Sequence, residues 1–176
     1  PVPDSFATDA NYPFPHFSEW TDRAFHRQLS KTRKHDILPD LLVKTARCAM
    51  KEVMSDSSPQ VLLHGDLHHG NILFDDRSGW TVIDPKGVIG PFCLEFGRFL
   101  HNNLNHREPH HDCVKQIHER IAVIHSILDV PVKLIALSCL VDWVLSLCWS
   151  LDEEILGSHL IHEITCLVAF AKSIAV

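Results

Sequence analysis

The stretch His64–Asn71 reads HGDLHHGN, and the chain continues at Ile83–Lys86 with the sequence IDPK. Between them, two short apolar runs flank the turn sequence DDRSG, so this connecting segment is predicted to form a β-hairpin. A hairpin brings its two ends together. The side chains of Asp66, Asn71 and Asp84 are therefore expected to share one small volume.

An Asp, an Asn five residues later and a second Asp after a hairpin strand form the layout of a kinase catalytic loop and metal site. Phosphoryl transfer needs a carboxylate that accepts and orients the substrate hydroxyl. It also needs oxygen ligands that hold Mg²⁺ between the nucleotide phosphates. Asp66 suits the first role, and Asn71 and Asp84 suit the second. The alternative interpretation is that all three only cap turns and strand ends.

The strings HGDLHHGN and IDPKGVIG resemble the aminoglycoside phosphotransferase family of the protein-kinase-like fold. They are most similar to its branch of aminoglycoside 6-phosphotransferases (streptomycin kinases) and hydroxyurea phosphotransferases. The resemblance implies that Asp66 is the catalytic base, that Asn71 and Asp84 are Mg²⁺ ligands, and that ATP is the phosphoryl donor. It also implies a catalytic place for His68, facing the transferred phosphoryl group; the alternative is that His68 only fills the loop.

Residues near this motif are expected to support it. The resemblance implies that Glu95, in the stretch CLEFGRFLHN, helps to hold the catalytic loop. His64 is expected to anchor the loop by hydrogen bonds rather than to bind a metal. Lys86 is expected to bind the nucleotide together with Asn71 and Asp84, and the alternative is a solvated side chain.

The most apolar stretch of the chain, LIALSCLVDWVLSLCWSL at residues 134–151, is interrupted by Asp142. A carboxylate at its middle and its short length favour a buried helix over a membrane span. Because a buried carboxylate without a partner is costly, Asp142 is expected to face a cavity or a cationic group, and it is the candidate for substrate binding. Residues 152–154 are further acidic candidates, but the favoured interpretation is that they cap the N-terminus of the last helix.

The predicted fold is mainly α with a small β-hairpin. Residues 1–17 are predicted to be an irregular Pro-rich lead. Residues 18–176 are predicted to form a kinase-like C-terminal lobe, with the catalytic loop and metal hairpin at 61–86 and a helical substrate-binding region at 92–176. The helices are expected from Ser18 to before Lys31, and near 38–54, 93–105, 112–128, 131–150 and 153–175, with the hairpin at 71–84.

A kinase also needs an N-terminal lobe with a phosphate-binding loop, a strand Lys and a helix Glu. Only 63 residues precede His64, and none of them is glycine, so this lobe is expected to be absent from the chain. Catalysis by the chain alone is then expected to be weak or absent. The exposed lobe face would be covered by the missing lobe or by self-association. The alternative function is a non-catalytic kinase-like remnant that acts as a helical binding module.

The composition excludes several classes of protein. The net charge is −6 and no run of Lys or Arg exceeds two, which argues against a nucleic-acid partner. Six scattered cysteines without a C-x-x-C pair favour reduced thiols in a cytoplasmic protein, neither a disulfide framework nor a zinc knuckle. His110–Cys113 is too crowded to favour a structural zinc site. A small-molecule hydroxyl compound is the expected substrate, with neither a membrane nor a nucleic acid as partner.

Overall fold

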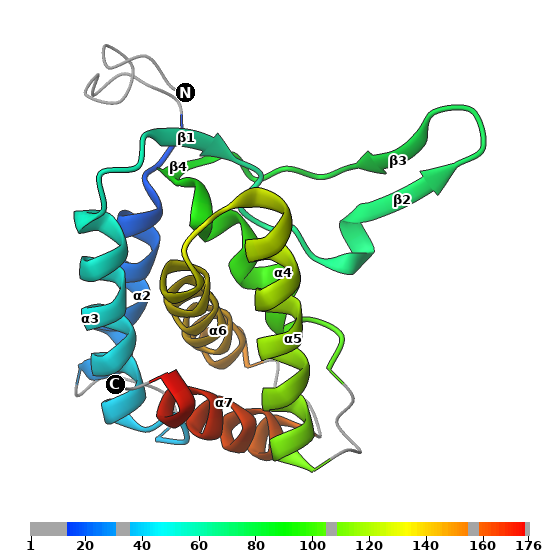
Figure 1. Ribbon diagram of the computed structural model, residues 1–176. Coiled ribbons are helices and arrows are strands. Elements are labelled where there is room, and N and C mark those ends of the chain that lie inside the picture. The colour runs from blue at the N-terminus through cyan, green and yellow to red at the C-terminus, as the bar shows by residue number, and fades with distance from the viewer. Residues whose placement is uncertain (1–13, 31–35, 105–108, 155–158, 175–176) are drawn as a thin grey trace.

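Helices dominate the computed structural model, which describes residues 14–30, 36–104, 109–154 and 159–174. Two small antiparallel sheets lie at one end of the helices (Figure 1). The prediction of a mainly helical fold with a small hairpin is confirmed. In chain order the elements are α2 (Phe17–Leu29), α3 (Asp40–Ser55), β1 (Gln60–Leu63), the 3-10 turn η1 (His69–Asn71), β2 (Ile72–Asp75), β3 (Gly79–Val82), β4 (Val88–Pro91), the 3-10 helix η2 (Phe92–Phe96), α4 (Gly97–His101), α5 (His110–Leu128), α6 (Val132–Asp152) and α7 (Leu160–Ile174).

Helix α6 is the central helix, and α2, α3, α4, α5 and α7 all pack against it (Figure 1). It is apolar around its whole circumference, as expected of a helix that is surrounded by other helices. Within the described part of the chain it is the one helix long and apolar enough to cross a membrane, but 78% of its most apolar window is buried. The predicted buried helix is therefore confirmed.

The two N-terminal helices pack against each other and against α6 through amphipathic faces. Helix α2 begins at Phe17, which is fully buried, and α3 begins directly after Pro39, a residue suited to a helix start. The predicted helices at these places are confirmed to within two residues at each described end. Of the predicted irregular lead, residues 1–13 lie outside the described part, and Phe17 is already helical.

The β-structure consists of two strand pairs, of which sequence patterns predicted one. Strands β2 and β3 form the predicted hairpin, with Ile72 opposite Val82, and it projects away from the helices (Figure 1). Strand β4 was not predicted. It pairs antiparallel with β1, so that Leu63 lies opposite Val88. The β1–β4 pair thus closes the base of the segment that contains the motif loop and the hairpin.

The C-terminal half differs from prediction in two places. The helix expected at 93–105 is the 3-10 helix η2 followed by the short helix α4. The last helix begins at Leu160 rather than at residue 153, so the predicted N-terminal cap at residues 152–154 is wrong. Asp152 instead ends α6, and its carboxylate accepts hydrogen bonds from Arg27 and Gln28 of α2. A cation on a neighbouring helix is thus one partner of this carboxylate.

Candidate active site

The motif loop begins where β1 ends, and His64 ties it to the returning hairpin. The His64 ring accepts a hydrogen bond from the Asp66 amide at Nδ1 (3.2 Å), and Nε2 donates to the Ile83 carbonyl (2.8 Å). An amide can only donate and a carbonyl can only accept, so these partners fix the tautomer with hydrogen on Nε2. The His64 carbonyl also accepts from the amide of Lys86 (2.9 Å). One histidine thus joins both sides of the loop.

Glu95 of η2 holds the same loop by hydrogen bonds to its backbone amides. Its Oε2 accepts from the His64 amide at 2.7 Å and its Oε1 accepts from the Gly65 amide at 3.4 Å. Burial raises the pKa of Glu95, and the two amide donors oppose that rise. Gly65 adopts a left-handed φ of 77°, and a Cβ there would lie 2.7 Å from Val88 Cγ1. Glycine is therefore needed where the chain turns over β4.

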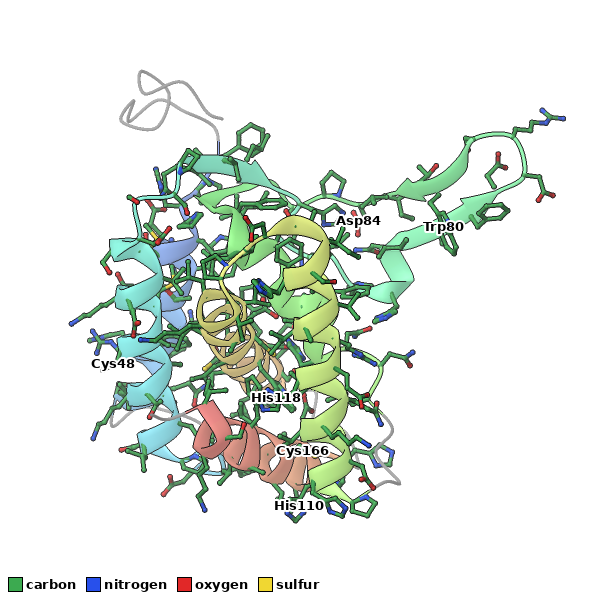
Figure 2. All side chains as sticks on the ribbon, viewed as in Figure 1. Cys48, Trp80, Asp84, His110, His118 and Cys166 are labelled. Carbon is green, nitrogen blue, oxygen red and sulfur yellow. The ribbon has the colours of Figure 1, made fainter. Side chains whose placement is uncertain are left out.

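Asn71 joins the loop to the hairpin. Its Nδ2 donates to the Asp66 carbonyl (3.0 Å), and its own carbonyl accepts from the Ile83 amide (3.0 Å). Asn71 is 7% exposed, whereas Asp84 is exposed at the base of the hairpin (Figure 2). Asp84 has a φ of 59°, a left-handed conformation that Asp tolerates better than most residues. The structure thus places Asp66 and Asn71 on one segment and Asp84 on the segment that is hydrogen-bonded to it.

The carboxylate of Asp66 lies between two cations. Lys86 Nζ is 2.7 Å from Oδ2, and Arg98 Nε is 3.6 Å from Oδ1. Sequence patterns singled out Lys86 as a nucleotide ligand but missed Arg98. The available signal was a lone charged residue in the apolar run FGRFL, three positions after Glu95. The positive charges of Lys86 and Arg98 thus balance the negative charge of the Asp66 carboxylate.

Asp142 lies on the other side of Arg98, so the expectation that it faces a cationic group is confirmed. Its Oδ2 is 3.2 Å from Arg98 Nε and 2.8 Å from His101 Nε2. Burial by itself would raise the pKa of Asp142, but Arg98 and His101 outweigh burial and lower it. Asp142 is only 2% exposed, and its direct contact with a substrate stays a prediction.

A cavity of about 350 Å³ lies beside these ion pairs. The Trp149 ring forms one side of it, with Lys86 Nζ and Arg98 Cζ each 5.6 Å from the ring centroid, within cation–π range. Arg98 Nη1 also donates to Ser146 Oγ at 2.7 Å. A larger hollow of about 640 Å³ against α2 contains none of the motif residues. The lining residues of the smaller cavity are Trp20, Lys86, Arg98, Ser146, Trp149, Ser150 and Glu153.

The two other histidines of the loop, His68 and His69, have different surroundings. His68 Nδ1 accepts from the Gly70 amide at 3.0 Å, which caps the 3-10 turn η1. His69 stacks on Phe99 with ring centroids 4.5 Å apart, and its Nδ1 is 3.2 Å from Asn102 Oδ1. His69 therefore attaches the loop to α4. The catalytic place of His68 stays a prediction.

Comparisons with known proteins agree with this motif. A family model described as aminoglycoside/hydroxyurea antibiotic resistance kinase matches residues 8–153. The streptomycin 3''-kinase of Klebsiella pneumoniae is 49% identical over 41 residues, 23% of this chain and 15% of that protein. The hydroxyurea phosphotransferase of Kitasatospora aureofaciens is 41% identical over 49 residues, 28% and 14% of the respective chains.

The methylthioribose kinase of Bacillus pumilus (strain SAFR-032) is 36% identical over 77 residues, 42% of this chain and 19% of that enzyme. These matches span less than a fifth of the length of each curated relative. No solved structure shows a significant match. The family match covers most of the chain and includes the loop, the hairpin and Glu95. The chain therefore belongs to the aminoglycoside/hydroxyurea antibiotic resistance kinase family, a family of small-molecule phosphotransferases.

Proposed function

We propose that this chain is the C-terminal lobe of an enzyme that transfers the γ-phosphoryl group of ATP to a hydroxyl of an aminoglycoside such as streptomycin, or of a related small molecule. The observation that carries the proposal is a pair of hydrogen bonds, both 3.0 Å long, that join the loop to the hairpin. Asn71 Nδ2 donates to the Asp66 backbone carbonyl, and the Ile83 amide donates to the Asn71 backbone carbonyl. This pair keeps a carboxylate and two oxygen-bearing side chains on adjoining segments. Phosphoryl transfer depends on such positioning.

The donor atoms suit Mg²⁺. Asn71 uses its amide nitrogen on the Asp66 carbonyl, so its Oδ1 is the atom left for a cation. Asp84 adds an exposed carboxylate, and carboxylate and amide oxygens are preferred ligands of Mg²⁺. In this proposal Asn71 and Asp84 hold the ion, which supplies charge neutralisation at the nucleotide phosphates.

Asp66 has to exchange a partner before it can orient a hydroxyl. Its Oδ2 is paired with Lys86 at 2.7 Å, and the Lys86 side chain is 47% exposed and able to swing away. A nucleotide phosphate would offer Lys86 a second anion, and Asp66 Oδ2 would then accept the hydroxyl proton. Arg98 stays in place, because Ser146 and Asp142 hold it from the other side.

The test is Mg·ATP-dependent phosphorylation of a panel that includes streptomycin, hydroxyurea and methylthioribose. It uses protein of verified intact mass, the variant Asp66→Asn, and the matched control Asp76→Asn in the exposed hairpin turn. We expect transfer by the 20.0 kDa chain to be weak, and to fall by about 100-fold or more in Asp66→Asn because general-base assistance is lost. Transfer that survives in Asp66→Asn within tenfold would refute the role of Asp66.

A non-catalytic helical binding module is the second candidate function. The observation that favours it is the Lys86–Asp66 ion pair, which occupies the carboxylate that catalysis requires. In this case no panel compound would be phosphorylated. The Lys86→Met variant would bind Mg·ATP, measured by calorimetry, no more weakly than the unchanged chain. A loss of nucleotide affinity in Lys86→Met would instead favour the phosphotransferase.

A further inference from the structure

A second group of reactive side chains lies far from the motif loop, where α7 packs against α5. Cys113 comes from the start of α5, and His162 and Cys166 come from α7. Residues four positions apart share one helix face, so His162 and Cys166 face α5 together. The ligand atoms of all three residues lie within 4.8 Å of one another. Figure 2 labels Cys166 at this junction of the two helices.

The two sulfur–nitrogen distances in this group are compatible with a tetrahedral metal site. His162 Nε2 is 3.3 Å from Cys166 Sγ and 3.8 Å from Cys113 Sγ. With Zn–S bonds of about 2.3 Å and Zn–N bonds of about 2.05 Å, tetrahedral angles place the sulfur and nitrogen about 3.6 Å apart. Both observed separations lie close to that value. Small side-chain rotations would seat an ion between the three atoms.

Burial and ligand chemistry favour a soft divalent cation. The two cysteines are 0% and 2% exposed, so their sulfurs are shielded from bulk solvent, whereas the half-buried His162 leaves one side open to an ion and a water. Two thiolates neutralise a charge of +2, and sulfur with imidazole selects Zn²⁺ over Mg²⁺. Next to His162, Glu163 accepts a hydrogen bond from Trp143 Nε1 of α6 at 3.0 Å. That bond orients α7 independently of any ion.

We propose that Cys113, His162 and Cys166 form a Zn²⁺ site with three protein ligands and a fourth position for water, and that the bound ion ties α7 to α5. Each thiol releases its proton to solvent as its sulfur binds the ion, so the site with its ion carries no net charge. Sequence spacing disfavoured zinc because no C-x-x-C pair is present. The fold instead brings Cys113 to a His-x-x-x-Cys pair that begins 49 residues later.

The test is metal binding by the tag-free, reduced and metal-stripped 176-residue chain. Co²⁺ serves as the optical probe, Zn²⁺ as the competitor, and elemental analysis after gel filtration gives the stoichiometry. We expect one ion per chain, cobalt–thiolate charge-transfer absorption that Zn²⁺ abolishes, and a higher melting temperature with Zn²⁺. Cys166→Ser and His162→Gln should each weaken Co²⁺ binding by more than about 100-fold. Replacing a residue that only hydrogen-bonds to a metal ligand already lowers metal affinity by about 10- to 100-fold, and these variants remove a ligand itself.

Two matched controls separate this site from adventitious binding to the other thiols and histidines. Cys48→Ser removes an exposed thiol on α3, and His118→Gln removes a histidine of α5 whose Nε2 contacts Ser173. Both controls should bind Co²⁺ as the unchanged chain does. His162 is partly exposed, so His162→Gln gives an answer even if Cys166→Ser does not fold. The proposal is overturned if the unchanged chain shows no cobalt–thiolate band, or if His162→Gln binds Co²⁺ with unchanged affinity.

Discussion

Replacement of Asp142 by Ala should destabilise the protein strongly, because it removes the carboxylate shared by the buried His101 and the partly buried Arg98. The Asp142 carboxylate is 2.8 Å from His101 Nε2 and 3.2 Å from Arg98 Nε, and the residue is 2% exposed. Breaking a buried ion pair by removing one partner costs 3–5 kcal/mol, and Arg98 still keeps Ser146 and Asp66. We therefore expect a loss of about 3 kcal/mol in the free energy of unfolding, at the lower end of that range.

Urea unfolding followed by circular dichroism measures this loss. With a denaturant slope of about 2 kcal/mol per M, a loss of 3 kcal/mol lowers the midpoint by about 1.5 M. The control is Glu119→Ala, because Glu119 pairs with Lys115 and their side chains are 64% and 75% exposed. Such a surface pair contributes at most about 1 kcal/mol. If Asp142→Ala costs no more than Glu119→Ala, the buried network does not stabilise the fold as reasoned. Asp142→Asn extends the comparison should the Ala variant not fold.

Three further predictions concern the same helices and loop. The pKa of Asp142 is lowered, so the stabilisation that its carboxylate provides is complete above the ordinary value of 3.8 and is lost as the pH falls below it. In Asp142→Asn the free energy of unfolding should therefore fall less steeply with decreasing pH in this acid range. The pKa of Glu95 is raised from 4.5, so ionisation of Glu95 lowers the stability of the fold as the pH rises through its pKa in the folded protein. Glu95→Gln cannot ionise, so its free energy of unfolding, measured in the same urea series, should improve relative to that of the unchanged chain over this pH range. A Cβ at Gly97 would lie 2.5 Å from Asp142 Cβ. Gly97→Ala should therefore lower the free energy of unfolding, measured by calorimetry, by about 1–3 kcal/mol. An unchanged unfolding free energy would show that α4 and α6 can move apart without cost.

Local patterns predicted those elements that depend on near neighbours in the sequence. The hairpin follows from the turn sequence DDRSG, where Asp75 Oδ1 accepts from the amides of Arg77 and Ser78. Strand β4 was missed because its sequence VIGP contains Gly and Pro, which are typical of turns, and its pairing with β1 is a long-range contact. The start of the last helix was misplaced because the acidic residues 152–154 imitate a first helical turn. In the structure Asp152 ends α6 and pairs with Arg27 of α2, a tertiary contact that the local sequence does not reveal.

In the candidate site, too, local sequence patterns predicted the contacts between near neighbours and missed the long-range ones. The positions of Asp66, Asn71 and Asp84 in the chain were enough to expect their loop and hairpin to adjoin, because a hairpin brings its ends together. The pairing of Asp66 with Arg98 was not deducible, since it depends on the packing of α4 against α6. The cluster of Cys113 with α7 has the same origin, because two helices have to pack before their thiols meet.

The pairing of β1 with β4 has a consequence for how the loop acquires its shape during folding. The whole segment from His64 to Gly87 is closed by that pair, and closing a loop of roughly 25 residues costs about 3 kcal/mol of chain entropy. We therefore expect the loop to take its shape only after α2 and α3, which contact β4, have assembled, and to open when the β1–β4 pair opens. Amide hydrogen exchange at His64 and Asn71 should accordingly proceed at the rate set by the opening of the β1–β4 pair.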